Sequence, residues 1–123
     1  MINMERIDIR EISYSFALKI IDLYKHLISK NEYVMSKQIL RSGTSIGANI
    51  EEAQAAQTKR DFIAKMSIAA KEARETNYWL NLLRDSGYLA DYMHSDKLTE
   101  GLTLIIKTLT KIVKTSQKNI SNK

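Results

Sequence analysis

Residues 59–85 read KRDFIAKMSIAAKEARETNYWLNLLRD and hold the most regular heptad repeat of the chain. Small or apolar side chains recur there in steps of four and three: Phe62, Met66, Ala69, Ala73, Thr76, Leu80 and Leu83. This spacing places them on one face of an α-helix that packs against other helices. Thr58, followed three residues later by Asp61, predicts the N-terminal cap, and Gly87 predicts a left-handed residue after the last turn. We therefore expect a helix over residues 59–85.

Three further segments repeat apolar residues every three or four positions, as amphipathic helices do. They cover residues 8–29, 34–57 and 96–118. Proline, which breaks helix interiors, does not occur in the sequence. Four amphipathic helices with short connections bury their apolar faces best against one another. We predict an all-α, antiparallel up-down-up-down four-helix bundle that forms a single domain over residues 1–123.

Side chains that carry an oxygen atom mark the expected helix starts. Asp8, with Glu11 three residues later, predicts the first start; Asn31 or Ser36 predicts the second, and Ser95 the fourth. The apolar faces then predict the core. Its expected members are Phe16, Leu23, Ile46, Ile50, Phe62, Met66, Leu80, Leu102, Ile105 and Leu109.

The composition excludes several classes of protein. With 44% hydrophobic and 27% charged residues, the chain resembles an ordinary globular protein, not a disordered or membrane protein. The lack of cysteine excludes disulfides, thiol nucleophiles and thiolate metal sites. No stretch approaches the ~20 apolar residues of a membrane span, and residues 1–10 lack the apolar run of a signal peptide. We expect a cytoplasmic protein without a membrane partner.

The net charge of +5 arises at the C-terminal end of the chain. All 14 acidic residues precede residue 103, whereas five of the 19 basic residues follow it: Lys107, Lys111, Lys114, Lys118 and Lys123. The first four fall on outward positions of the last helix, so they should form one solvated row. Such a row either keeps the protein soluble or binds the phosphates of RNA or DNA.

Two glycines, Gly43 and Gly47, lie four residues apart inside the second helix. Each costs about 1 kcal/mol of helix stability relative to alanine, so a compensating contact is expected. We interpret them as a place where another helix approaches closely. The expected partner is the small face of the third helix, formed by Ala69, Ala70 and Ala73; the alternative is a gap kept open for a ligand.

A polar row runs beside these glycines and consists of Ser42, Ser45, Asn49 and Glu52. Polar groups beside a core need hydrogen-bond partners, and Arg74 or Glu75 on the third helix is the expected one. We interpret the row as a seam between helices or between subunits. A metal site is the weaker alternative, because two carboxylates and an asparagine without histidine bind transition metals poorly.

The residues give little support to catalysis. His26 follows Asp22 by four positions and His94 follows Asp91 by three, but each pair is typical of a surface histidine near an acid. The serines of the polar row have no histidine on their own helix to act as a base. The two glycines lie inside a helix, not at the start of one, where they would cradle a phosphate. We predict no enzyme, no cofactor and no metal site.

One string, RSGTSIGANIEEA at residues 41–53, resembles the bacterial 23S rRNA intervening sequence proteins, also called S23-type four-helix-bundle proteins. Its Ser-Ile-x-x-Asn-Ile-x-Glu pattern carries the resemblance, together with residues 59–62 and 71–76. The resemblance implies a bundle that assembles into a homopentamer and whose gene is often inserted in 23S rRNA genes. It attaches no catalytic residue to the motif, so Ser45, Asn49, Glu52 and Glu75 carry over only as a structural seam.

Two functions fit these observations. The first is a non-enzymatic, oligomeric bundle that binds nucleic acid without reading its sequence, or serves as an accessory protein, in association with 23S rRNA intervening sequences. The second is a protein–protein interaction scaffold without a nucleic-acid role. Apolar residues outside the core faces predict a subunit interface: Leu18, Ile21, Ile63, Ile68 and Leu82. Three aromatic residues are interpreted as core or subunit contacts: Tyr78, Trp79 and Tyr88.

Overall fold

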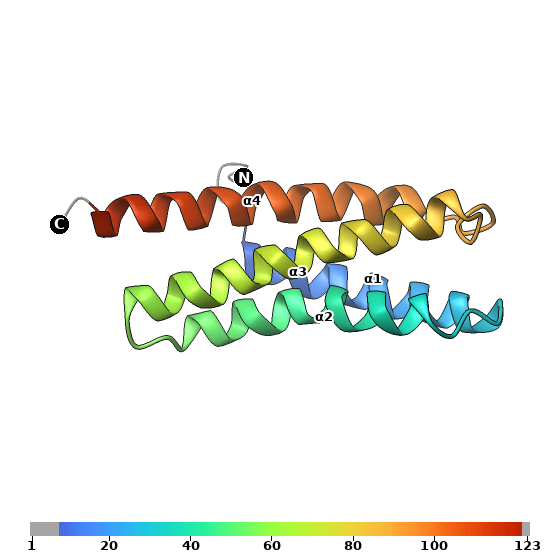
Figure 1. Ribbon diagram of the computed structural model, residues 1–123, viewed down its shortest axis with the longest axis horizontal. Helices are drawn as coiled ribbons and strands as arrows, with labels where there is room; N and C mark the ends of the chain where they lie inside the picture. Colours follow the sequence, from blue (N-terminus) through green and yellow to red (C-terminus); the bar gives the residue numbers. More distant parts are fainter. Residues whose placement is uncertain (1–7, 122–123) are drawn as a thin grey trace, which may run out of the picture.

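The computed structural model describes residues 8–121, and four α-helices make up this part of the chain (Figure 1). They are α1 (Ile9–Ser29), α2 (Met35–Gln54), α3 (Lys59–Asp85) and α4 (Ser95–Ser121). Each helix packs against the next one along the chain, and α4 returns to α1, whereas the diagonal pairs do not touch within residues 8–121. The helices therefore form a square antiparallel bundle, and the predicted all-α architecture is confirmed.

Three predicted helix boundaries rest on the expected side chains. The Asp8 carboxylate accepts a hydrogen bond from the amide of Arg10, at 2.9 Å, and caps α1. The Thr58 hydroxyl accepts from the amide of Asp61 at 3.0 Å and caps α3. Gly87 has a φ of 91°, the left-handed conformation that closes the end of α3. In these places the local sequence alone determines the boundary.

The start of α2 differs from the prediction. Asn31 is not a cap; it adopts a positive φ of 63° in the turn, and Ser36 lies buried inside the helix. Instead, the carboxylate of Glu32 accepts hydrogen bonds from the amides of Val34, Met35 and Ser36. Burial alone would raise the pKa of Glu32, but these amides outweigh it and lower the pKa.

Two further boundaries are corrected. The helix α2 ends at Gln54, not at residue 57, because the amides of Ala55 and Ala56 bond to carbonyls three residues back and close the last turn. Ser95 was predicted to cap α4 but is its first helical residue. The amide of Leu98 bonds to the carbonyl of His94, which takes the preceding position.

The predicted core is confirmed in nine of its ten members, which are at most 2% exposed. The exception, Phe62, is only partly buried and packs against the edge of the core. It lies in the first turn of α3, where α3 and α4 extend beyond the described part of α1 (Figure 1). None of the four described helices combines the length and apolar character that a membrane span requires.

Candidate functional site

The lysine row lies on the outward face of α4. Leu98, Leu102, Ile105 and Leu109 are buried on the inward face of this helix. The heptad geometry therefore directs Lys107, Lys111, Lys114 and Lys118 outward, and all four are exposed. No residue in the described range 8–121 forms an ion pair with them. Their charges are therefore available to a ligand.

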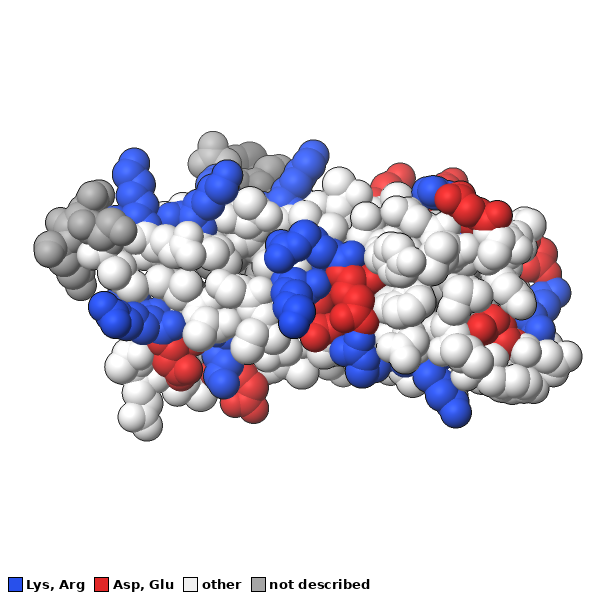
Figure 2. All heavy atoms as spheres, viewed as in Figure 1, with Lys and Arg blue, Asp and Glu red and all other residues white. Residues whose placement is uncertain are grey.

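Charge is distributed unevenly along α4. Its first part carries Asp96 and Glu100, whereas the acids are absent from residues 101–121. Figure 2 shows this separation, with blue side chains over the C-terminal half of α4 and red ones toward its start. From Lys107 to Lys118 the row spans about 16 Å at 1.5 Å per residue. The C-terminal half of α4 should therefore attract an anion more strongly than its first part does.

Shallow grooves accompany the lysine row. One of them is lined by Leu104, Lys107, Thr108, Lys111, Ile112, Thr115 and Ser116. The hydroxyl of Thr108 donates to the carbonyl of Leu104 at 2.7 Å, and that of Thr110 donates to the carbonyl of Ile106 at 2.8 Å. Because these protons are engaged within the helix, Thr108 and Thr110 do not compete with the lysine ammonium groups as hydrogen-bond donors on this surface.

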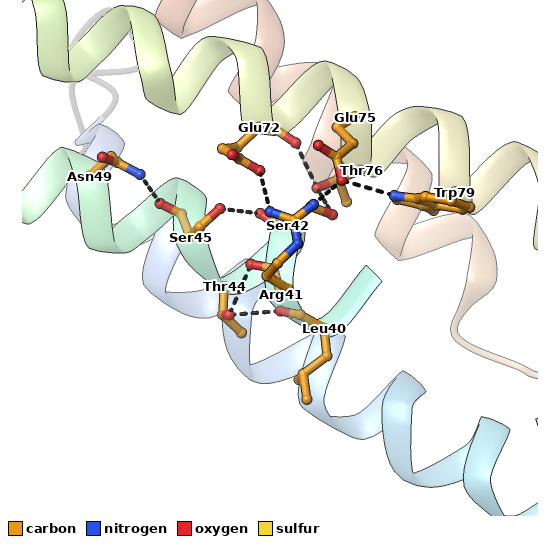
Figure 3. Close-up of polar contacts among 10 residues, drawn as sticks. All are labelled: Leu40, Arg41, Ser42, Thr44, Ser45, Asn49, Glu72, Glu75, Thr76 and Trp79. Atoms are coloured by element: carbon orange, nitrogen blue, oxygen red, sulfur yellow. Dashed lines mark hydrogen bonds and ion pairs between the residues drawn. The ribbon is translucent and has the colours of Figure 1, made fainter. Parts of the chain in front are cut away.

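Of the polar row of α2, only Ser42 is hydrogen-bonded to α3, with a different partner from those predicted (Figure 3). Ser42 is fully buried, and its hydroxyl is hydrogen-bonded to the hydroxyl of Thr76 at 2.8 Å. Ser45 and Asn49 donate to carbonyls of their own helix. The side chain of Glu52 is exposed and forms no hydrogen bond or ion pair with a described residue, so α3 meets the row only through Ser42.

An ionic contact between α2 and α3 was not predicted from the sequence. Arg41 forms ion pairs with Glu72, at 3.2 Å, and with Glu75 (Figure 3). Glu75 also accepts a hydrogen bond from the indole nitrogen of Trp79 at 3.0 Å. The predicted partner Arg74 is exposed and takes no part. The spacing of Glu72, Glu75 and Trp79 on one side of α3 was the available signal.

The aromatic residues of α3 and its C-terminal turn divide into two groups. Trp79 and Tyr88 are partly buried and pack against the core, as predicted. Tyr78 is 57% exposed, although its ring meets that of Trp79 edge-on at 5.4 Å. Tyr78 therefore belongs to the outer surface of α3.

The glycines of α2 approach α1, not the alanines of α3 as predicted. A Cβ atom on Gly43 would lie 2.8 Å from Cγ1 and 2.9 Å from Cγ2 of Ile20. A Cβ atom on Gly47 would lie 3.4 Å from the Ser13 hydroxyl oxygen. The prediction was wrong because α2 has a neighbour on each side, and helical periodicity alone does not say which neighbour a given residue meets. Ala69, Ala70 and Ala73 are buried in the core of α3.

These distances predict opposite effects for the two glycines. Gly43→Ala should destabilise the bundle by about 1–2 kcal/mol, because the clash with branched carbons of Ile20 exceeds the helix propensity gained. Gly47→Ala should be neutral or stabilise by up to about 1 kcal/mol, because its contact is an ordinary van der Waals distance. Urea denaturation of both variants measures the difference. Equal effects would contradict the assignment of Gly43 as the tight contact.

Neither predicted histidine–acid pair forms in the structure: His26 pairs with Asp91, and the ring of His94 contacts the ring of Tyr92. His26 lies 3.3 Å from Asp91, which also pairs with Lys30, and Asp22 accepts a hydrogen bond from Tyr92 at 2.5 Å. Burial, reinforced by Asp22, raises the pKa of Tyr92. These ion pairs and this hydrogen bond hold the connection between α3 and α4 against α1 and the turn that follows it. Within residues 8–121 no group of three or more His, Asp or Glu residues is placed to hold a metal ion.

The fold and the lysine row define a small all-α bundle protein with one strongly basic helix. A family model described as "23S rRNA-intervening sequence protein" matches residues 5–111. The chain therefore belongs to this family, and the predicted resemblance is confirmed. Lys114 and Lys118 lie beyond the matched residues, so the family match says nothing of them. No curated protein matches the chain.

A solved structure has the same fold. It is the 1.70 Å crystal structure of a protein with unknown function from the S23 ribosomal protein family of Bacteroides thetaiotaomicron VPI-5482. The two chains are 49% identical, with a TM-score of 0.83, and the comparison covers 87% of this chain and 99% of that chain. The similarity therefore extends over most of the bundle.

Proposed function

We propose that the protein is a non-enzymatic, oligomeric bundle that binds RNA or DNA without reading its sequence, as an accessory of 23S rRNA intervening sequences. One observation carries this proposal: four exposed lysines, unpaired within residues 8–121, form a row on the C-terminal half of α4. Ammonium groups bind phosphates mainly as point charges, and phosphate contacts carry no sequence information. The family description, which refers to 23S rRNA, agrees with a nucleic-acid partner.

Replacement of all four lysines tests this proposal. The variant Lys107→Gln/Lys111→Gln/Lys114→Gln/Lys118→Gln should bind nucleic acid at least about 100-fold more weakly at 50 mM salt, because four charges no longer neutralise phosphates. Fluorescence anisotropy with a labelled oligonucleotide measures the affinity. A matched control replaces four other exposed lysines away from this half of α4: Lys19, Lys25, Lys37 and Lys97. If both variants bind as the parent does, the α4 row is not the contact surface.

Assembly into a homopentamer is the second part of the proposal. Four of the five apolar residues predicted to form an interface are exposed: Leu18 (54%), Ile21 (38%), Ile68 (42%) and Leu82 (37%). Ile63 is partly buried. The exposed residues lie on outer faces of α1 and α3, and a second copy that covers them would remove apolar surface from water.

Light scattering at micromolar concentration checks the assembly. The expected mass is five times the 14.1 kDa of one chain. Five chains of +5 each carry +25 together, which strengthens the attraction of a polyanion. A measured mass of 14.1 kDa would refute the oligomer.

The exposed apolar residues also support the alternative function, a protein–protein interaction scaffold. In that case the parent protein fails to bind RNA or DNA at 50 mM salt, where electrostatic binding is strong. Co-purification from the native host would then identify the protein partner. Binding of RNA or DNA at 50 mM salt therefore distinguishes the two functions.

A further inference from the structure

A second row of cations lies on the outer surface of α3. It consists of Arg60, Lys71 and Arg74, and Arg60 and Arg74 are two heptads apart. All three are exposed, and no residue that the structure describes forms an ion pair with them. The nucleic-acid part of the proposed function does not use this row, although Lys71 lies one turn from Ile68, which the proposed assembly would cover.

The contacts of α3 establish which way the row faces. Glu72 and Glu75 pair with Arg41 of α2, and Thr76 bonds to Ser42 of α2. Arg74 lies two positions from Glu72 and from Thr76, and is therefore rotated by about 200° around the helix from each of them. It thus points away from α2, toward the side of α3 that adjoins α4.

The rows of α3 and α4 lie on neighbouring helices. The two helices are antiparallel neighbours, so the start of α3 and the end of α4 lie at the same end of the bundle (Figure 1). Packed helices have axes about 8–10 Å apart. Figure 2 shows blue side chains both along α4 and over the middle and start of α3, on one face of the molecule. Two acids of this part of α3, Glu72 and Glu75, share the single positive charge of Arg41 through ion pairs.

We propose that these two rows form one surface that binds the sugar–phosphate backbone of a duplex in preference to a single strand. This inference rests on the proposed nucleic-acid function. A single strand has one line of phosphates and follows one row, whereas a duplex presents two backbones to two rows. A duplex also carries about one charge per 1.7 Å and releases more counterions per neutralised phosphate, with a slope near 0.9 instead of about 0.7.

The side chains beside the rows agree with a duplex ligand. Proteins that hold single strands stack successive bases on several aromatic rings. The helix α4 contains no aromatic residue. On α3, Tyr78 follows Arg74 by one turn and is exposed, but one ring accommodates only one base. The two packed helices hold the rows at a fixed separation. A duplex is already ordered, whereas a single strand would lose conformational entropy on binding both rows.

The test compares a short duplex of mixed sequence with each of its strands, as DNA and as RNA, at 50 mM salt. The parent protein should bind the duplex at least about tenfold more tightly than either strand. The variant Arg60→Gln/Lys71→Gln/Arg74→Gln should lower duplex affinity at least about tenfold and reduce the salt slope by about 2.7, because three fewer phosphates are neutralised. The control variant Lys19→Gln/Lys25→Gln/Lys37→Gln should change neither value by as much.

Each other result overturns the inference. Equal or tighter binding of the single strands would exclude the duplex preference. Unchanged duplex affinity of the α3 variant would exclude the second row. A changed oligomeric mass of that variant, by light scattering, would assign the row to a subunit contact instead. If the parent binds neither duplex nor strand, the proposed function itself fails, a result distinct from binding without preference.

Discussion

Ile50→Ala is expected to lower the free energy of unfolding by about 2–5 kcal/mol, because it removes buried carbon atoms and leaves a cavity. Ile50 is fully buried on α2, in the same apolar face as the buried residues Ile39 and Ile46. Urea denaturation followed by circular dichroism measures the change as a lower midpoint with an unaltered slope. The protein concentration must be the same for both samples, since assembly stabilises a folded chain by mass action.

Val34→Ala provides the control for this substitution. Val34 is 73% exposed before the first turn of α2, so the loss of its methyl groups should change stability by less than about 0.5 kcal/mol. A similarly small effect for Ile50→Ala would mean that the apolar face of α2 does not point into the core. The predicted bundle would then be wrong at its second helix.

Helical periodicity predicted which residues are buried, because burial in a bundle follows from the position of a residue around its own helix. Asp8, Thr58 and Gly87 were predicted for a similar reason, since each acts within three residues of its own position. Glu32 was missed because its carboxylate meets three amides in a turn where Asn31 adopts a left-handed conformation. The sequence pattern does not reveal that turn.

Contacts between helices were less predictable than burial. The polar row and the glycines of α2 were identified, but the pattern did not show that Ser42 meets Thr76 or that Gly43 meets Ile20. Arg41 and Glu72 lie 31 residues apart, and their pairing depends on the register of two packed helices. The lysine row was easier to place, because an outward position requires no knowledge of a neighbour.

Different residues of α4 provide its stability and its charge. Its buried leucines and isoleucines hold it against α1 and α3, while the lysines contact no described acid. Replacing those lysines therefore removes no ion pair of the described residues and relieves repulsion between like charges along the helix. The glutamine variant should keep the helical content and mass of the parent, so that weaker binding reports on the surface alone.

The affinity of the assembled protein for nucleic acid is expected to fall about a thousandfold or more between 50 and 200 mM salt, if six or more phosphates are neutralised. The four lysines of one chain alone would give a fall of about 150-fold over the same range for a duplex. The larger value therefore requires cations beyond one α4 row, supplied by further subunits or by other basic residues of the same chain.

Anisotropy titrations at several salt concentrations measure this slope, and the glutamine variant of the α4 row is the internal reference. If the lysines bind phosphates, the plot of log affinity against log salt becomes flatter in the variant, by about 0.9 for each phosphate that is no longer neutralised. A parent whose affinity hardly changes with salt would indicate that hydrophobic or hydrogen-bonded contacts dominate. In that event the lysine row only keeps the protein soluble, and the protein–protein interaction scaffold becomes the favoured function.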